Sequence, residues 1–304
     1  MAQDALNIFL NKPKADVHNH FHLGGSKQRF LALYNPPNFV FPSKYEGLPG
    51  MIDFIYQDLN RYLRTEQDVI NFMRISIESS IDDNITYLEA SVDINLARFF
   101  GGSIQRVIEE TKNLVEEFKD RIDFRPEIGV NKDLDLDTAY NHTQACFDSG
   151  VFHSIDLYGA EANQDLYPFV NLYKEAARNG LKTKVHIGEF SDAQSISEAI
   201  EILNPDEIQH GISAIDDNDV IDMILERDIR LNICPESNIM LGRIQNLKAH
   251  PVRALFDKGV NITINTDDLI LFHKTNSQQL QELHDLGIFS LEELDSIRSN
   301  GFNQ

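Results

Sequence analysis

Eight short runs rich in β-forming residues alternate with helical patterns along this chain of 304 residues, and that alternation constrains its fold. The runs cover residues 15–23, 85–94, 124–130, 152–159, 182–189, 207–212, 229–236 and 260–268. Strands that alternate with helices pair in parallel, and eight such units close into a barrel. The sequence therefore predicts an α/β fold, a single (β/α)8 TIM barrel formed by residues 1–304. An open doubly wound sheet is the alternative, although no GxGxxG motif follows the first run.

Helix ends are visible in three of the stretches between these runs. Ser103 precedes apolar residues at helical spacing over 104–120 and is a suitable N-cap. Gly180 closes the helical pattern over 164–180, and Gly259 closes another, as glycine commonly does. These signals place helices where a barrel of alternating units requires them.

The first crossover is long. Residues 27–84 separate the first two runs, with an irregular part over 34–50 and then a helical part. An insertion after the first strand of a barrel lies at the active-site mouth, so we expect a helical insertion there that can serve as a lid. Phe54, Ile55 and Leu59 are expected to form helix core, although a lid would use the same residues.

Composition excludes several classes of partner. Aspartate and glutamate number 48 against 27 lysines and arginines, a formal charge of −21, and such a surface repels nucleic-acid backbones. No stretch approaches the roughly 20 apolar residues of a membrane span, and the N-terminus lacks the features of a secretory signal. With only Cys146 and Cys234, no disulfide framework is expected. We expect a cytoplasmic protein that acts on a small molecule, with no oligomeric state specified.

The strongest chemical signal is the triplet His18-Asn19-His20 in the first run. Residues two apart on a strand face the same way, about 7 Å apart by strand rise, so two imidazoles can share one metal ion. His22 places a third histidine on the same face.

Three further polar groups end other runs: His186 and Glu189 in the fifth, His210 in the sixth, and Asp267-Asp268 in the eighth. Each alone has a structural explanation, since a histidine can be core and paired aspartates can form a turn or cap. Together they lie at the carboxyl ends of predicted strands, where βα barrels place catalysis. Three histidines and an aspartate suit one zinc ion, or another divalent transition metal, with a position left for water.

Six motifs in this order resemble those of the adenosine and adenine deaminases: KADVHNH, DLYGAE, VHIGE, QHGI, LNICPESN and HPVRALFDKGVNITINTDD. The resemblance extends from Pro13 to about Asn300. It implies that one zinc ion per chain is held by His18, His20, His186 and Asp267. It implies that Glu189 is the acid that protonates the ring, His210 the base, and Asp268 the residue that orients water. Substrate contacts are expected from Gly159, Asp156 and His22.

The chemistry of such a site is consistent with these roles. A metal lowers the pKa of bound water to near 7, which supplies hydroxide to attack an aromatic C–N carbon. An acid must then protonate the adjacent ring nitrogen, and a glutamate does so best when burial raises its pKa. We therefore expect metal-dependent hydrolytic deamination of a 6-aminopurine such as adenosine, adenine or a related purine. A two-metal site is disfavoured because the fourth run lacks the lysine that bridges such sites in related hydrolases.

One departure concerns the sugar. Where the family has an acidic residue after its histidine pair, this chain has His22. Aligning on Gly24-Gly25-Ser26 instead would make His20 and His22 the metal pair and put Gly24 in the acid's place. KADVHNH favours His18 and His20. In either alignment the acid is missing, so a free base or a differently substituted purine is expected to react faster than adenosine.

Two alternative functions remain at this point. One is hydrolysis of a different aminated or N6-substituted heterocycle by the same class of enzyme. The other is a deaminase-like binding protein without catalysis, which the complete residue set disfavours. Three other polar residues are expected to be structural: Cys234 as a packed thiol, Asn238 in shaping a loop, and His250 as a cap or surface residue.

Overall fold

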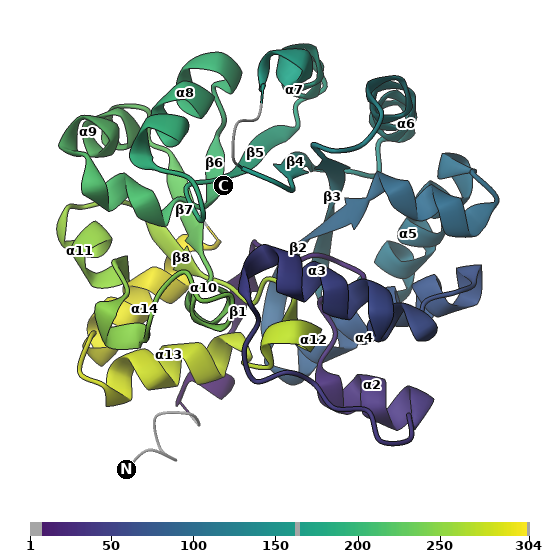
Figure 1. Cartoon of the computed structure of the whole chain (residues 1–304), viewed down its shortest axis with the longest axis horizontal. Coiled ribbons are helices and arrows are strands. Elements are labelled where there is room, and N and C mark those ends of the chain that lie inside the picture. The colour runs from purple at the N-terminus through teal and green to yellow at the C-terminus, as the bar shows by residue number, and fades with distance from the viewer. Residues whose placement is uncertain (1–7, 162–164, 303–304) are drawn as a thin grey trace.

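The computed structural model describes residues 8–161 and 165–302. Within them, eight parallel strands pair in chain order in one sheet that curves into a nearly closed barrel surrounded by helices (Figure 1). The strands are β1 (Lys14–Asp16), β2 (Ile85–Asp93), β3 (Asp123–Asn131), β4 (Ser154–Tyr158), β5 (Lys182–Ile187), β6 (Glu207–His210), β7 (Arg230–Ile233) and β8 (Ile262–Ile264). The predicted barrel is confirmed. Residues 1–7 of the N-terminal stretch and Gln164, which begins a predicted helical stretch, lie outside the described residues.

Helices follow every strand of the barrel. The α-helices are α2 (Lys27–Tyr34), α3 (Gly47–Gln57), α4 (Glu66–Asp82), α5 (Ile104–Phe118), α6 (Leu136–Ser149), α7 (Val170–Arg178), α8 (Ala193–Leu203), α9 (Asn218–Glu226), α10 (Pro235–Met240), α11 (Val252–Asp257), α12 (Leu269–Phe272), α13 (Asn276–Asp285) and α14 (Leu291–Asn300). The 3-10 helices are η1 (Leu59–Arg61), η2 (Ile94–Phe100), η3 (Tyr167–Phe169), η4 (Ile212–Asp216) and η5 (Leu247–Ala249). Ser103 caps α5 as predicted, since its hydroxyl accepts from the Arg106 amide. Gly180 and Gly259 both have positive φ after their helices.

Three predicted strands end three or more residues before the sequence pattern indicated. The first ends at Asp16, and residues 19 and 20 pair only through isolated bridges to Asp267 and Ser91. The seventh ends at Ile233, because a proline at 235 opens α10 instead of continuing the ladder. The eighth ends at Ile264, and the left-handed φ of +57° at Asp267 is incompatible with a strand.

The barrel closes between β8 and β1 through side chains more than through a strand ladder. The Val17 amide donates to Asn265 Oδ1 at 2.9 Å, and the Asp267 amide donates to the His18 carbonyl at 2.9 Å. The Thr266 hydroxyl donates to the Asp16 carboxylate. This seam therefore places the histidines after β1 directly beside the aspartates after β8.

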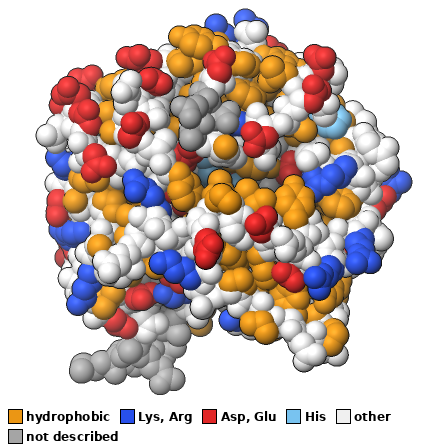
Figure 2. All heavy atoms as spheres, viewed as in Figure 1, with side chains coloured by type: hydrophobic (Ala, Val, Ile, Leu, Met, Phe, Trp, Pro, Cys, Tyr) orange, Lys and Arg blue, Asp and Glu red, His pale blue; other side chains and the backbone are white. Residues whose placement is uncertain are grey.

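The first crossover forms α2, α3 and α4, with an irregular segment over 35–46. Tyr45, at the end of that segment, is buried and joins the crossover to two helices at the carboxyl ends of the strands. Its amide donates to the Met240 carbonyl of α10 at 2.8 Å, and its hydroxyl to the Leu271 carbonyl of α12 at 3.3 Å. Figures 1 and 2 show the same face of the molecule. Hydrophobic side chains cross its middle in Figure 2, where α3 lies in Figure 1.

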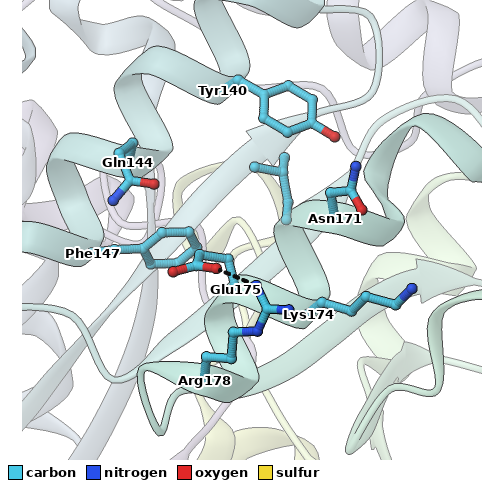
Figure 3. Close-up of a pocket in the computed structure, with 8 residues that line it drawn as sticks. Tyr140, Gln144, Phe147, Asn171, Lys174, Glu175 and Arg178 are labelled. Carbon is cyan, nitrogen blue, oxygen red and sulfur yellow. Dashed lines mark hydrogen bonds and ion pairs between the residues drawn. The ribbon is translucent and has the colours of Figure 1, made fainter.

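The surface of this face carries acidic and basic side chains interspersed (Figure 2). A groove of about 210 Å³ lies elsewhere, between α6 and α7 on the outside of the barrel (Figure 3). It is lined by residues such as Tyr140, Asn171 and Lys174, and none of the predicted site residues lines it. No helix among the described residues combines the length and the apolar character that crossing a membrane requires.

Candidate active site

The four predicted metal ligands converge at the carboxyl ends of β1, β5 and β8. His18 Nε2 lies 3.0 Å from His186 Nε2, and His20 Nε2 lies 3.5 Å from Asp267 Oδ1. His18 Nε2 is 3.9 Å from the same Asp267 oxygen. His18, His20 and His186 form one cluster whose ligand atoms all lie within 4.8 Å of one another.

The hydrogen bonds behind two of these rings indicate a cation between them. His18 Nδ1 faces the Asn232 carbonyl oxygen at 3.0 Å, and His186 Nδ1 faces Asp156 Oδ1 at 3.0 Å. Both partners are acceptors, so each neutral ring carries its hydrogen on Nδ1 and a lone pair on Nε2. Two lone pairs that point at each other across 3.0 Å repel, and a shared metal ion removes that repulsion. Burial, then the neighbouring histidines, lowers the pKa of His18, so its ring is neutral near pH 7 and able to bind a metal.

Asp156 was expected to contact substrate. The structure places its buried carboxylate behind His186, on the ring edge opposite the nitrogen that faces His18. In this position the carboxylate fixes the tautomer and orientation of the histidine, as carboxylates commonly do behind metal-ligating imidazoles.

The alternative metal pair, His20 and His22, has no support from the geometry. No cluster of potential ligands among the described residues includes His22, which is half-buried with its Nδ1 unpartnered. Burial, then the charge of His20, lowers the pKa of His22 to about 3, so this ring is neutral near pH 7. Gly24 offers no room for a side chain, because a Cβ there would lie 2.1 Å from Asn19 Oδ1.

Glu189 and His210 face each other beside the metal-ligand cluster. Glu189 Oε2 lies 3.5 Å from His210 Nε2, which in turn lies 3.9 Å from Asp267 Oδ2. Burial, then the charges of Asp267 and Glu161, raises the pKa of Glu189 well above its usual value. Burial and the neighbouring histidines lower the pKa of His210. Both shifts favour the uncharged form, so this site makes the carboxyl group hold its proton more strongly and the imidazole hold its proton more weakly than either does in water.

A chain of hydrogen bonds that the sequence did not reveal reaches the acid through Asn238. Asn238 Nδ2 donates to Glu189 Oε1 at 2.6 Å and lies 3.4 Å from His210 Nδ1. His250 Nε2 donates to Asn238 Oδ1 at 3.0 Å, because its Nδ1 is occupied as acceptor of the Val252 amide at 3.1 Å. His250 thus caps α11, but it is buried and not a surface residue. Only the folded chain brings α10, α11 and β5 together, so a motif search could not find this contact.

Asp268 completes the polar wall beside Asp267. Its Oδ1 is buried without a partner among the described residues, and burial, then Asp267, raises its pKa well above the usual range. Asp267 and His210 are non-glycine residues with φ of +57° and +64°. Such backbone typically costs about 1–3 kcal/mol and concentrates at functional sites.

Gly159 ends β4 in a conformation that only glycine adopts easily. Its φ is +106°, and a Cβ there would lie 2.8 Å from Asn131 Oδ1. The residue before it, Tyr158, has its ring 5.0 Å from that of His20. Tyr158 belongs to the same DLYG motif, but the motif alone does not show that its ring contacts His20.

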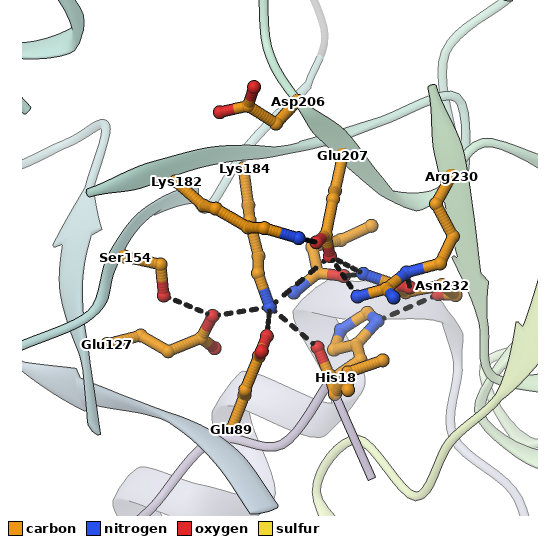
Figure 4. A network of polar contacts seen from close by, with 12 residues as sticks. His18, Glu89, Glu127, Ser154, Lys182, Lys184, Asp206, Glu207, Arg230 and Asn232 are labelled. Carbon is orange, nitrogen blue, oxygen red and sulfur yellow. Dashed lines mark hydrogen bonds and ion pairs between the residues drawn. The ribbon is translucent and has the colours of Figure 1, made fainter. Parts of the chain in front are cut away.

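A layer of buried charges supports the cluster from inside the barrel (Figure 4). Lys184 projects from β5 toward three carboxylates, with Glu127 Oε1 at 2.6 Å and Glu207 Oε2 at 3.5 Å, and it contacts Glu89. Burial alone would lower the pKa of Lys184, but these carboxylates outweigh it and hold the pKa above its usual range. Asn232 links this layer to the site, since its Nδ2 donates to Glu207 while its carbonyl oxygen orients His18.

Comparisons with known proteins point to one family. The sequence profile described as adenosine deaminase matches residues 13–304. A Treponema pallidum (strain Nichols) protein designated an adenosine/adenine deaminase is 36% identical over 286 residues, 94% of this chain and 96% of that protein. The crystal structure of an adenine deaminase from Arthrobacter aurescens has a TM-score of 0.83 at 24% identity, covering 95% of this chain and 92% of that one. The N6-methyl-AMP deaminase from Arabidopsis thaliana has a TM-score of 0.78 at 19% identity, covering 96% and 91%. The two structures share the barrel fold.

Proposed function

The chain belongs to the adenosine deaminase family of purine-deaminating hydrolases, and we propose that it replaces the 6-amino group of a purine with oxygen at the site described above. The observation that carries this proposal is a buried Glu189 with a raised pKa, 3.5 Å from His210, in one site with two other imidazole Nε2 atoms that face each other at 3.0 Å. The first supplies a proton for a ring nitrogen. The second fits a metal ion.

The proposed ligands are His18, His20, His186 and Asp267, a nitrogen and oxygen set that suits zinc. A bound ion of this kind would act as a Lewis acid that activates a water molecule for attack on the ring. Asp156 and Asn232 hold two of the ligating rings in the required tautomer. We propose that these four residues hold a single metal ion.

The remaining groups handle protons and orientation. Glu189 holds its proton on Oε2, because Oε1 accepts the hydrogen bond from Asn238. It would donate that proton to the ring nitrogen next to the attacked carbon. His210, kept neutral by burial, would take a proton from the attacking water, and the unpartnered Oδ1 of Asp268 would orient that water. Water and the aminopurine thus give the oxopurine and ammonia.

We further propose that the substrate is not plain adenosine. His22 and Gly24, the two positions that could replace the family's sugar-contacting acid, carry no carboxylate, and a neutral histidine accepts through one nitrogen only. Without that carboxylate, a free base or a purine with a different substituent would lose less binding free energy than adenosine does. Gly159 and His22 are the proposed ring and substituent contacts. An N6-substituted aminopurine is the second candidate, favoured by the fold shared with the Arabidopsis N6-methyl-AMP deaminase.

A substrate panel on protein of measured metal content tests the proposal. Adenine, adenosine, deoxyadenosine, their phosphates and N6-methyl analogues are incubated in turn, and ammonia or methylamine release is followed. We expect adenine or an N6-substituted purine to have the highest kcat/KM. Adenosine ahead by a factor of ten would overturn the substrate assignment, while no turnover of any purine would overturn the enzymatic one.

A further inference from the structure

We propose that Glu161 is a positioning residue that holds the turn over 188–191, and through it the acid Glu189, in the geometry required for proton transfer. The turn connects β5 to α8 and carries Glu189 at its second position. This inference rests on the proposed role of Glu189. It concerns how the acid is held in place, a question that the proposed role itself leaves open.

The carboxylate of Glu161 is surrounded by the donors of this one turn. Its Oε2 accepts from the amides of Gly188 at 2.9 Å, Phe190 at 3.1 Å and Ser191 at 2.9 Å, and from the Ser191 hydroxyl at 2.6 Å. Its Oε1 accepts from the Glu189 amide at 3.2 Å. Glu161 is only 8% exposed, so these four consecutive amides and the hydroxyl satisfy a carboxylate that has little water.

The carbonyl side of the turn is held as well. The Gly188 carbonyl accepts from the Ser213 amide at 2.9 Å, and the Ser191 carbonyl from the Ser213 hydroxyl at 2.7 Å. The Glu189 carbonyl accepts from the Arg243 guanidinium. Glu161 is the acceptor that all four amides share, although the Gly188 amide also donates to the Ser191 hydroxyl oxygen at 3.0 Å, and amides left without an acceptor in a buried or part-buried turn are costly. The turn conformation therefore depends on Glu161.

Local sequence explains why the amides converge. Gly188 has φ of +77°, and a Cβ there would lie 2.4 Å from Ile196 Cδ1, so only glycine permits this reversal. Successive amides in such a turn point into one concavity that binds an anion. Here the anion is a side chain of the same protein, delivered by the segment that follows β4.

A carboxylate is required because both of its oxygens accept hydrogen bonds, and only together do they reach all four amides. In a Glu161→Gln variant, the amide oxygen can replace Oε2 and accept from Gly188, Phe190 and Ser191. The NH2 group then faces the Glu189 amide, donor against donor. The repulsion between these two donors acts on the backbone of Glu189. The proposed metal ligands make no hydrogen bond to the Glu161 carboxylate, so we expect them to stay in place.

Three variants test the inference on metal-loaded protein. Glu161→Gln removes the second acceptor oxygen at constant shape, and Glu161→Asp keeps the charge on a shorter arm. Asp192→Asn is the matched control: Asp192 caps α8 directly after the turn, its carboxylate touches none of the four amides, and asparagine caps equally well. Metal content, kcat and KM are measured with the best purine of the panel.

We expect Glu161→Gln to lower kcat on the order of 10–100-fold, with unchanged metal content and a KM within about threefold. Glu161→Asp should recover part of the loss, and Asp192→Asn should match wild type. In a Glu189→Gln background the same Glu161 substitution should lower kcat less than about threefold, because the effects of residues that act as a unit are not additive. An equal loss in both backgrounds would overturn the inference.

A second measurement does not depend on turnover. Amide hydrogen exchange is followed on a peptide covering the turn in wild type, Glu161→Gln and Asp192→Asn. We expect at least tenfold faster exchange in Glu161→Gln alone. Wild-type protection in that variant would overturn the positioning role even if no purine were a substrate, so failure of this inference and failure of the proposed function are distinguishable.

Discussion

At the scale of single residues, the site combines groups whose protonation states burial sets in advance. Burial raises the pKa of Glu189 and lowers that of His210, the proposed acid and base, whose side chains lie 3.5 Å apart. Two carboxyl groups, Glu189 and Asp268, have raised pKa values for the same first reason, the loss of solvent. Pairs of titratable groups tuned in this way are typical of acid–base catalysis.

Glu189→Gln should abolish nearly all turnover and leave metal binding intact. Glutamine has almost the same shape but no carboxylic proton to give to the ring, and loss of a general acid typically costs on the order of 10²–10⁴-fold in rate. Ammonia release and elemental analysis on the same preparation check this. Wild-type kcat in the variant would remove Glu189 from the mechanism.

Asn238→Ala should lower kcat by about 5- to 150-fold, the loss expected for one buried hydrogen bond. The substitution leaves Glu189 Oε1 without its donor and His250 without its acceptor. The acid's proton is then free to occupy either oxygen. Asn246→Ala is the control, because Asn246 only caps η5. Equal kcat in the two variants would contradict the role of Asn238.

The residues that sequence reasoning identified share one property, their place at a predicted strand end. His18, His186, Glu189 and Asp267 could be found because a barrel brings all strand ends together. Asn238 and Glu161 could not, because each acts on Glu189 from another element through contacts that have no sequence spacing. Asp156 belongs to a motif as well, but the motif does not reveal that one oxygen of its carboxylate faces His186 Nδ1.

At the scale of elements, strand order was predictable and strand length was not. β1 and β8 are three residues each, although the predicted runs extended over 15–23 and 260–268. At the seam between β8 and β1, the side chains of Asn265 and Thr266 make hydrogen bonds where a strand ladder would otherwise make them. These side-chain contacts depend on tertiary packing, so the sequence pattern does not reveal them. The proposed ligands lie on both sides of this seam, His18 and His20 after β1 and Asp267 after β8.

Metal removal should therefore destabilise the barrel at the seam. A ligand present at 1,000 times its Kd stabilises the folded state by about 4 kcal/mol, so chelation should lower Tm on the order of 10 °C. Calorimetry of the untreated, chelated and zinc-restored protein measures the shift. Asp267→Ala is the control and should respond little to chelator. An unchanged Tm on complete metal removal would contradict this account.

At the scale of the whole molecule, stability depends on histidines that folding keeps neutral. Burial lowers the pKa of both His22 and His250 to about 3, while an unfolded histidine titrates near 6.5. The unfolded chain thus binds more protons than the folded one between these values. Stability from such groups is present above pH 6.5 and is lost as the pH falls toward 3.

His250 isolates this effect, because no cluster of potential metal ligands among the described residues includes it and its pKa is lowered by burial alone. Its Nδ1 must stay unprotonated to accept from the Val252 amide, so protonation breaks the cap of α11 as well as charging a buried ring. Below pH 6.5 each such histidine adds up to about 1.4 kcal/mol per pH unit to the slope of the unfolding free energy. We expect His250→Gln, which cannot titrate, to be less stable than wild type at pH 7.5 but to lose stability less steeply between pH 6.5 and 4.5. Urea unfolding at half-unit pH steps gives both slopes. Parallel slopes would mean that His250 titrates alike in the folded and the unfolded chain, which would contradict the role of its Nδ1 as acceptor of the Val252 amide.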